Sequence, residues 1–200
     1  VTSVLNANGQ NQTKYKNAAG QVAQVKDQHG NNIDYTYDAL GQLIKTLATG
    51  NTTVLTYDQR GRKIRMEDPA MGVWDYAYNA FGELVWQQDS LGQATTLTYD
   101  ALGRLTKRTE PDLISEWRYD KKFDATACGK GIGKLCEAKS NNGYRRIHTY
   151  DSLGRPGSTA TALDSTTVLA TVSQTYNAST GRLATQTWPT GYIATYTYTP

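Results

Sequence analysis

The stretch Tyr99-Asp100-Ala101-Leu102-Gly103-Arg104-Leu105 is the clearest copy of a phrase that recurs throughout this 200-residue chain. Each copy opens with a tyrosine, and most successive copies lie 20 to 22 residues apart, with two longer steps of 31 and 26 residues. A period of this size indicates one supersecondary unit stacked many times. The tyrosines that open the nine copies are Tyr15, Tyr37, Tyr57, Tyr78, Tyr99, Tyr119, Tyr150, Tyr176 and Tyr198.

The phrase has the residues of a hairpin corner. An aspartate at the first turn position accepts hydrogen bonds from the turn amides, and a glycine at the last position tolerates positive φ. Asparagine accepts the same bonds, but the loop opened by Asn177 is one residue longer and is expected to be looser. The predicted corners, each given as tyrosine, turn-opening residue and glycine, are Tyr37, Asp38 and Gly41; Tyr57, Asp58 and Gly61; Tyr78, Asn79 and Gly82; Tyr99, Asp100 and Gly103; Tyr150, Asp151 and Gly154; and Tyr176, Asn177 and Gly181.

A second turn lies about halfway between successive tyrosines, as at Asp68 to Gly72 and Asp89 to Gly92. The segments between the corners are rich in Thr, Tyr, Val and Trp, and their side chains alternate, so that Trp74, Tyr76 and Tyr78 share one face. A period of two with turn residues at both ends predicts an all-β chain of tandem antiparallel β-hairpins.

The composition favours a sheet of a single layer. Hydrophobic residues make up 38% of the chain, and fourteen tyrosines stand beside two phenylalanines, which is too polar for a thick two-layer core. One tyrosine-lined face and one threonine-rich, wet face would explain both values. With strands about 4.8 Å apart, about seventeen strands would form a ribbon on the order of 80 Å long, and open sheets of that length usually curl.

The Tyr-Asp-x-x-Gly-Arg-Leu phrases resemble the YD repeats of RHS-family proteins, a group that includes bacterial polymorphic toxins, the shell-forming components of insecticidal toxin complexes, and teneurins. The resemblance covers nearly the whole chain, and its best copies are Tyr99 to Leu105, Tyr57 to Arg62 and Tyr150 to Arg155. Two copies depart from the pattern, because Gln42 and Glu83 stand where arginine is expected.

The resemblance implies a long, curved, spiralling single-layer sheet that forms part of a hollow shell, which in known members encloses a C-terminal toxin polypeptide. Residues 1–200 are accordingly predicted to be tandem YD repeats with a longer hairpin insert at 120–149. Full enclosure needs more repeats, so we expect a segment of a larger protein. The implied partners are the remainder of that polypeptide and its enclosed toxin. The implied location is secreted or at the cell surface, delivered by a bacterial secretion system.

The longest step, from Tyr119 to Tyr150, contains both cysteines of the chain, Cys128 and Cys136. Its Gly-x-Gly-x-Gly run lacks the Ser or Thr that a phosphate loop needs, and two cysteines are too few for a closed zinc site. A lengthened hairpin corner is favoured, in which Gly133-Lys134-Leu135 resumes the Gly-Arg-Leu part of the phrase. If the chain is exported, the two cysteines are able to pair across that hairpin, although spacing alone leaves the bond open.

Arginines that follow the turn glycine are expected to pair with turn carboxylates or to stack on a neighbouring tyrosine. The alternative is a basic stripe for polyanions, but 21 basic and 18 acidic residues give a net charge of only +3, so no nucleic-acid partner is predicted. No apolar run approaches the roughly eighteen residues of a membrane span. The arginines concerned are Arg62, Arg104, Arg155 and Arg182.

Flat aromatic side chains beside Asp, Asn and Gln are also able to hold sugars, which makes a carbohydrate-binding or cell-surface adhesion module the alternative function. Pairs such as Tyr35 with Tyr37 occupy equivalent positions two residues apart, as cross-strand packing requires, and packing is therefore favoured. The residues that would contact surface glycans in the alternative are Trp74, Trp86, Trp117 and Trp188.

Catalysis has little support in the sequence. The only histidines, His29 and His148, have no acid and nucleophile arranged beside them as a recognisable triad, and the aspartates are committed to turns. We therefore predict no enzymatic activity, no catalytic residue, no metal and no cofactor. The predicted function is a structural β-shell segment that encapsulates or presents a secreted toxin.

Overall fold

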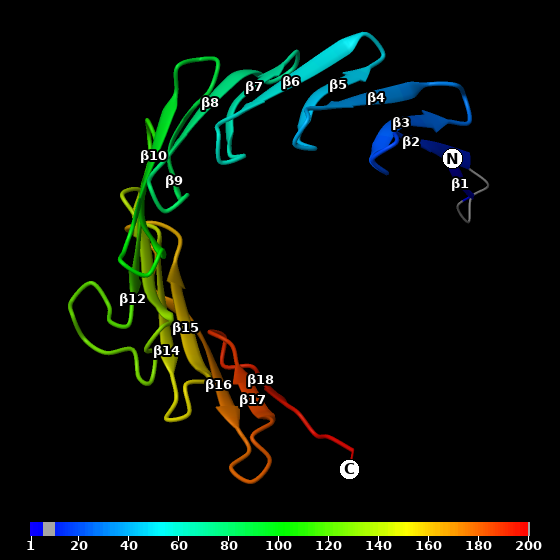
Figure 1. Cartoon of the computed structure of the whole chain (residues 1–200). Coiled ribbons are helices and arrows are strands. Elements are labelled where there is room, and N and C mark those ends of the chain that lie inside the picture. Colours follow the sequence, from blue (N-terminus) through cyan, green and yellow to red (C-terminus); the bar gives the residue numbers. More distant parts are fainter. Residues whose placement is uncertain (6–10, 200) are drawn as a thin grey trace. The chain divides into compact units, whose positions relative to one another are not determined.

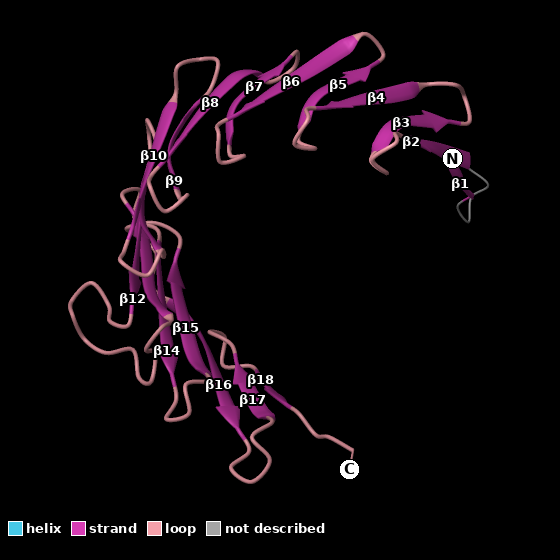
Figure 2. Cartoon of the chain, viewed as in Figure 1, coloured by secondary structure: helices cyan, strands magenta, loops and turns pink. Residues whose placement is uncertain are grey.

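The computed structural model describes residues 1–5 and 11–199. These residues form β-strands joined by turns and loops, and none of them lies in a helix (Figure 2). The chain divides into two compact units, Val1–Thr95 and Thr96–Pro200. The first contains β1 (Thr2–Leu5), β2 (Asn11–Lys16), β3 (Val22–Asp27), β4 (Asn32–Tyr37), β5 (Leu43–Ala48), β6 (Asn51–Tyr57), β7 (Lys63–Asp68), β8 (Gly72–Tyr78) and β9 (Leu84–Gln88). After them come β10 (Ala94–Tyr99), β11 (Leu105–Thr109), β12 (Ile114–Tyr119), β13 (Leu135–Ser140), β14 (Arg145–Tyr150), β15 (Pro156–Ala162), β16 (Ala170–Tyr176), β17 (Leu183–Thr187) and β18 (Ile193–Thr195).

Each unit is an antiparallel meander (Figure 1). Strands β1 to β9 pair in sequence order in the first unit, and β10 to β18 do so in the second. Within either unit, the described strands contact only their sequential neighbours, so each unit is a single layer. The predicted all-β fold of tandem antiparallel hairpins is confirmed.

Burial is shallow nearly everywhere. Most strand residues are half-buried, as expected where one face of a thin sheet carries the tyrosines. Buried residues within the described ranges all lie in the second unit, and most belong to the loop 120–134 and to the strand β13 that follows it. They are Cys128, Gly131, Cys136, Glu137, Ala138 and Ala162.

The tyrosine-led corners join β2 to β3, β4 to β5, and every second pair of strands thereafter. The intervening turns include the expected ones after Asp68 and Asp89, and a similar turn follows Asp27. The turn between β5 and β6 was not predicted from the sequence. In this turn the φ angle is 48° at Thr49 and 82° at Gly50. Two successive residues with positive φ form the tight two-residue hairpin that suits the twist of antiparallel strands.

A β-bulge accompanies every tyrosine-led corner in the described strands. The register shifts by one residue beside the tyrosine, so that Tyr99 faces Leu105 while Thr98 faces Lys107, and Thr106 is left as the extra residue. Bulges bend a strand and increase its local twist. The tyrosines beside these shifts are Tyr15, Tyr37, Tyr57, Tyr78, Tyr99, Tyr119, Tyr150 and Tyr176.

Candidate functional site

The repeated corner is built around one side-chain oxygen. Asp100 Oδ1 accepts hydrogen bonds from the backbone N–H groups of Leu102 (2.9 Å) and Arg104 (3.0 Å). The Gly103 N–H donates to the Asp100 carbonyl (3.0 Å), and Gly103 has a φ of 75°, which only glycine adopts without strain. The same pair of bonds to a side-chain oxygen occurs at Asp38, Asp58, Asn79 and Asp151.

The corner at Asn177 differs in the way that its extra residue requires. Asn177 Oδ1 accepts from the N–H groups of Ser179 and Thr180, both at 2.9 Å, and Gly181 N–H donates to the Asn177 carbonyl at 2.9 Å. The N–H of Arg182 is then too far along the loop for Asn177 Oδ1 and donates to Thr180 Oγ1 (3.4 Å).

The arginine after the glycine pairs with the aspartate that opens its own turn. Arg104 Nε lies 2.7 Å from Asp100 Oδ2, and the remaining oxygen, Oδ1, is occupied by the backbone bonds. Equivalent contacts join Arg62 to Asp58 (2.6 Å) and Arg155 to Asp151 (2.7 Å).

The same cation lies over the ring of the tyrosine that opens the following copy. Such a placement is attractive because the face of an aromatic ring is electron-rich. The structure thus contains both contacts that the sequence offered as alternatives. The centroid distances are 5.0 Å for Arg62 over Tyr78, 4.5 Å for Arg104 over Tyr119, 5.1 Å for Lys134 over Tyr150, 4.1 Å for Arg155 over Tyr176 and 5.1 Å for Arg182 over Tyr198.

The tyrosine hydroxyl completes the link to the preceding copy. Tyr78 donates to the carbonyl of Lys63 (2.8 Å), the residue immediately after Arg62. We use the term repeat clamp for a group of three side chains. It consists of the cation after a turn glycine, the aspartate that opens the same turn, and the tyrosine of the next copy, over whose ring the cation lies. Corresponding hydroxyl bonds are Tyr37 to Val22, Tyr57 to Leu43, Tyr150 to Leu135, Tyr176 to Pro156 and Tyr198 to Leu183, at 2.8 to 3.0 Å.

Replacing Tyr78 by Phe is expected to lower the free energy of unfolding by about 1 kcal/mol, because the Lys63 carbonyl loses its donor while the ring stays beneath Arg62. Urea denaturation followed by tryptophan fluorescence measures the change. The matched control is Tyr192→Phe, since the Tyr192 hydroxyl makes no hydrogen bond within the described residues. Equal losses in the two variants would contradict a specific role for the hydroxyl.

Acid should weaken the turns. The backbone N–H and then the guanidinium of Arg62 lower the pKa of Asp58, and the hydroxyls of Thr167 and Thr166 lower the pKa of Asp164 to about 2 from 3.8. A pKa that is lower in the folded state stabilises the fold fully above the unfolded value and loses that contribution as the pH falls through the folded value. Stability should therefore be level near neutrality and fall as the pH drops from about 4 towards 2.

Asp164→Asn tests this directly, because the amide oxygen still accepts the turn bonds but does not titrate. The variant should show a shallower loss of stability between pH 4 and pH 2, measured as the urea midpoint at each pH. Asp112→Asn, at a carboxylate without a hydrogen bond in the described structure, is the control and should keep the wild-type slope. If Asp164→Asn lost stability between pH 4 and pH 2 as steeply as the wild type, titration of Asp164 would not be the cause of the loss.

The insert interrupts one corner without destroying it. Asp120 N–H donates to the Lys134 carbonyl (3.0 Å), just as Asp100 N–H donates to that of Arg104 (3.0 Å), and Tyr119 faces Leu135 across a bulge. Gly133 N–H donates to Asp120 Oδ1. The extra residues thus lie between the first and last positions of the turn, within 120–134. The residues that follow, 135–150, form the regular hairpin of β13 and β14.

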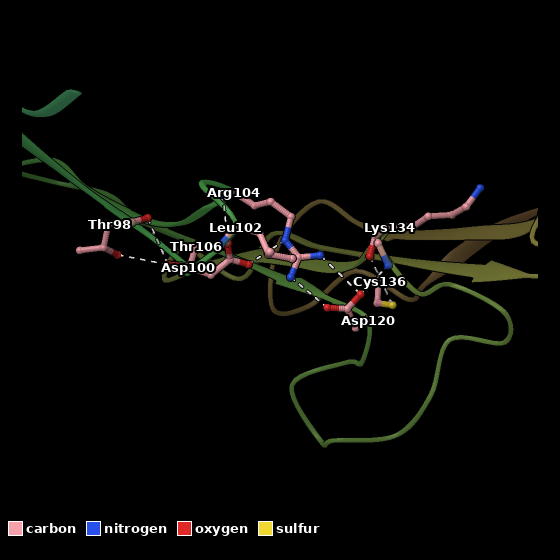
Figure 3. A network of polar contacts seen from close by, with 9 residues as sticks. Thr98, Asp100, Leu102, Arg104, Thr106, Asp120, Lys134 and Cys136 are labelled. Atoms are coloured by element: carbon pink, nitrogen blue, oxygen red, sulfur yellow. Dashed lines mark hydrogen bonds and ion pairs between the residues drawn. The ribbon is translucent and has the colours of Figure 1, made fainter. Parts of the chain in front are cut away.

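Arg104 joins the preceding corner to this interrupted one (Figure 3). Its guanidinium lies between Asp100 and Asp120, with Nη2 2.9 Å from Asp120 Oδ2. The hydrogen bonds that Arg104 donates to Asp120 and then to Asp100 raise the pKa of Arg104, and the Arg104 side chain followed by Gly133 N–H lowers the pKa of Asp120. Both groups therefore stay ionised across the physiological range.

Loop 120–134 covers the sheet beside β13, and we call it the cap. Cys128 and Cys136 form a disulfide bond, with their Cα atoms 5.7 Å apart. Tyr150 N–H donates to the Cys128 carbonyl (2.8 Å), and a Cβ at Gly129 would collide with the Tyr150 carbonyl oxygen, so the backbones approach closely there. The disulfide and these contacts hold the cap against its own hairpin and the next.

A buried carboxylate beneath the cap was not anticipated. Glu137 is 1% exposed, and it accepts hydrogen bonds from the backbone N–H of Phe123 (2.9 Å) and from Arg145 Nε (2.6 Å). The cations of Arg118 and Lys139 lie over the Phe123 ring at 5.2 and 4.1 Å. In sequence Glu137 occupies an ordinary strand position, and no local signal shows that a loop will close over it.

The four tryptophans lie on separate elements. Trp74 is in β8, Trp86 in β9, Trp117 in β12, and Trp188 follows β17. Trp74 stacks on Tyr76 with centroids 6.4 Å apart, and Trp188 packs at a tilt on Tyr192 at 5.4 Å. The glycan role of these residues stays a prediction.

Other chemistry is sparse in residues 1–5 and 11–199. They contain no cluster of three His, Cys, Asp or Glu side chains able to hold a metal ion, and no helix long and apolar enough to cross a membrane. His29 lies beside Gln28 in a turn, and His148 Nδ1 lies 3.1 Å from Thr159 Oγ1. Burial, and secondarily the charge of Arg146, lowers the pKa of His148.

Known proteins are similar to this chain in sequence or in fold. Residues 1–126 match the sequence profile of the family described as Teneurin YD-shell. The chain is 35% identical over 135 residues to the double-stranded DNA deaminase toxin A of Burkholderia cenocepacia (strain H111), which covers 66% of this chain and 9% of that protein.

Solved structures contain a similar fold. The TcdB2-TccC3 crystal structure aligns with a TM-score of 0.68 at 18% identity, covering 87% of this chain and 10% of that one. TcdB2-TccC3 without its hypervariable C-terminal region aligns with a TM-score of 0.54 at 14% identity, covering 89% and 11%. The chain therefore spans about a tenth of the length of these proteins.

Proposed function

The chain belongs to the Teneurin YD-shell family, and from that premise we propose that it forms a section of the wall of a hollow protein shell that encloses a toxin carried by the same polypeptide. The observation that carries the proposal is the repeat clamp. It ties a hairpin to the one that follows it within a sheet that has no second layer, which is what a wall requires.

The physical logic of the wall follows from its contacts. A single-layer sheet buries little apolar surface, so each hairpin gains little from a hydrophobic core. Arg62 compensates by binding Asp58 of its own corner and covering Tyr78 of the next. In a repeat array, stability is the sum of such nearest-neighbour terms, and it extends along as many repeats as the chain supplies.

We propose that this segment is not itself an enzyme. The deaminase toxin that it resembles aligns over only 9% of its length, and the aligned repeats carry turn-forming aspartates engaged with backbone amides. Any toxin activity would then reside elsewhere in the polypeptide, and the protein would be secreted or delivered by a secretion system. The carbohydrate-binding alternative is weakened by the packing of Trp74 and Trp188 on tyrosines of their own hairpins.

Protease protection tests the proposal. The full-length polypeptide that contains this chain is digested, and the toxin region is followed by mass spectrometry beside the same region produced without the shell. We expect the enclosed region to be cleaved at least about tenfold more slowly, because only its rare exposed state is a substrate. Equal rates would refute enclosure, and binding of the full-length protein to a glycan array that is lost on replacing the tryptophans would favour adhesion.

A further inference from the structure

One turn aspartate lacks the cation that binds the aspartate of other corners. At Asp58, Asp100 and Asp151, the residue after the glycine is an arginine that binds the aspartate of its own turn, and Asp120 is bound by Arg104 of the preceding copy. Where the turn opens with asparagine, an uncharged or acidic acceptor follows in two copies: Asn17 donates to Gln21 (2.9 Å) and Asn79 donates to Glu83 (2.6 Å). Asp38 is followed by Gln42 and has no cation bound to it in the described structure.

This mismatch leaves two acceptors without donors. Asp38 Oδ1 accepts from the N–H groups of Leu40 and Gln42, but Asp38 Oδ2 has no partner in the described structure, whereas Asp58 Oδ2 binds Arg62. Gln42 Oε1 is shielded from solvent and also has no donor. Buried polar atoms are nearly always satisfied, so an unsatisfied one calls for a missing donor.

A hollow opens where the cation is missing. It has a volume of about 550 Å³, is lined by residues of β5 and β6 and of the two corners beside them, and includes Asp38, Gln42, Tyr57 and Asp58 in its lining. Tyr57 donates its hydroxyl to the Leu43 carbonyl (2.8 Å), exactly as its counterparts do in other clamps, so its ring is held in the same place. The acceptor, the ring and the space of a repeat clamp are present, and only the cation is absent.

We propose that this hollow binds the guanidinium group of an arginine side chain carried by a polypeptide segment outside the described residues. Four of the five cations seated over a clamp tyrosine in the described structure are arginines. Arg62 shows why a guanidinium suits the place, because its nitrogens reach Asp58 Oδ2 and also the Asn79 carbonyl of the next corner (2.9 Å). An ammonium lacks that planar fork.

The charges that face the hollow permit a bound cation. Asp58 is already paired with Arg62, so Asp38 supplies the free negative charge, and Lys45, which also lines the hollow, supplies a positive charge. Lys45 does not forbid the site: Lys107 and Arg65 hold the corresponding positions beside the occupied clamps of Arg104 and Arg62. This inference goes beyond the shell role and holds whether or not the sheet encloses a toxin.

Nuclear magnetic resonance on the full chain with ¹³C-labelled tyrosine rings tests the site. The probe is N-acetyl-arginine amide, and its matched control is N-acetyl-citrulline amide, which has the same shape with a neutral urea group. We expect the arginine probe to shift the Tyr57 ring signals saturably, and the citrulline probe to bind at least about fivefold more weakly. Tyr57→Phe identifies the signals.

Two variants separate the site from nonspecific binding. Gln42→Arg supplies the missing cation from within and should abolish the response. Asp38→Asn keeps the turn, as Asn79 does in its own corner, and should weaken binding about fivefold. A response that does not saturate, an equal response to the citrulline probe, or unchanged binding in both variants would overturn the proposal.

Discussion

Replacing Glu137 by Ala is expected to lower the free energy of unfolding of the second unit by about 2–3 kcal/mol. Glu137 is 1% exposed, so its loss leaves the Phe123 N–H beneath the cap without an acceptor and opens a void there. The Arg145 side chain is 43% exposed and stays hydrated when its partner is removed, which keeps the loss below that of breaking a fully buried ion pair.

Urea denaturation measures how much stability is lost, and hydrogen exchange at the Phe123 amide shows whether the loss occurs beneath the cap. Exchange at that amide should accelerate in Glu137→Ala and less so in Glu137→Gln, whose amide oxygen is still able to accept. Glu116→Gln is the control, since Glu116 lies 3.5 Å from Lys139 in an exposed pair and should cost less than about 0.5 kcal/mol. Equal losses in Glu137→Ala and Glu116→Gln would show that the cap does not depend on Glu137.

Removing the disulfide should cost about 2.5 kcal/mol, the loop-closure entropy of a cross-link between residues eight apart. The effect should be confined to the cap, because Cys128 belongs to the loop and Cys136 to β13. The test compares Cys128→Ser/Cys136→Ser with the oxidised wild-type protein. Trypsin should then cut after Lys130 in the double variant and in the wild type treated with a dithiol, but slowly in the oxidised protein.

Lys107 provides the internal reference for that digestion. It lies in β11, away from the cap, and cleavage after it should not change when the disulfide is lost. Cleavage that rises equally after Lys107 and Lys130 would mean that the disulfide stabilises the unit as a whole and not the cap.

The sequence predicted the repeating parts of this structure well because their causes are local. Aspartate, glycine and the alternation of strand side chains act within a few residues, so the corner of Asp100 and Gly103 is readable from one copy. Repetition then places Arg62 beside Tyr78, because residues that touch between neighbouring copies are separated by a nearly constant number of positions in the sequence. The bulges escaped notice because an extra residue changes the pairing without changing the residue types.

The cap could not be read in the same way. Its contacts join Cys128, Glu137 and Tyr150 across different strands, and they depend on how a thirteen-residue excursion between Asp120 and Lys134 folds back. Nothing in the local pattern distinguishes Glu137 from an exposed strand glutamate. The unpaired Asp38 was equally hidden, because the departure at Gln42 was visible in sequence but its empty partner position was not.

The repeat clamp gives the sheet a direction. Each clamp takes its cation and carboxylate from one copy and its aromatic ring from the copy that follows, so Arg155 has no ring to cover until Tyr176 has been made. A hairpin that carries such a cation therefore leaves the ribosome with its clamp still open, and the clamp closes only after the next copy has been synthesised. The clamps thus close in the order in which the hairpins are synthesised, and each closes one hairpin later than the synthesis of its cation.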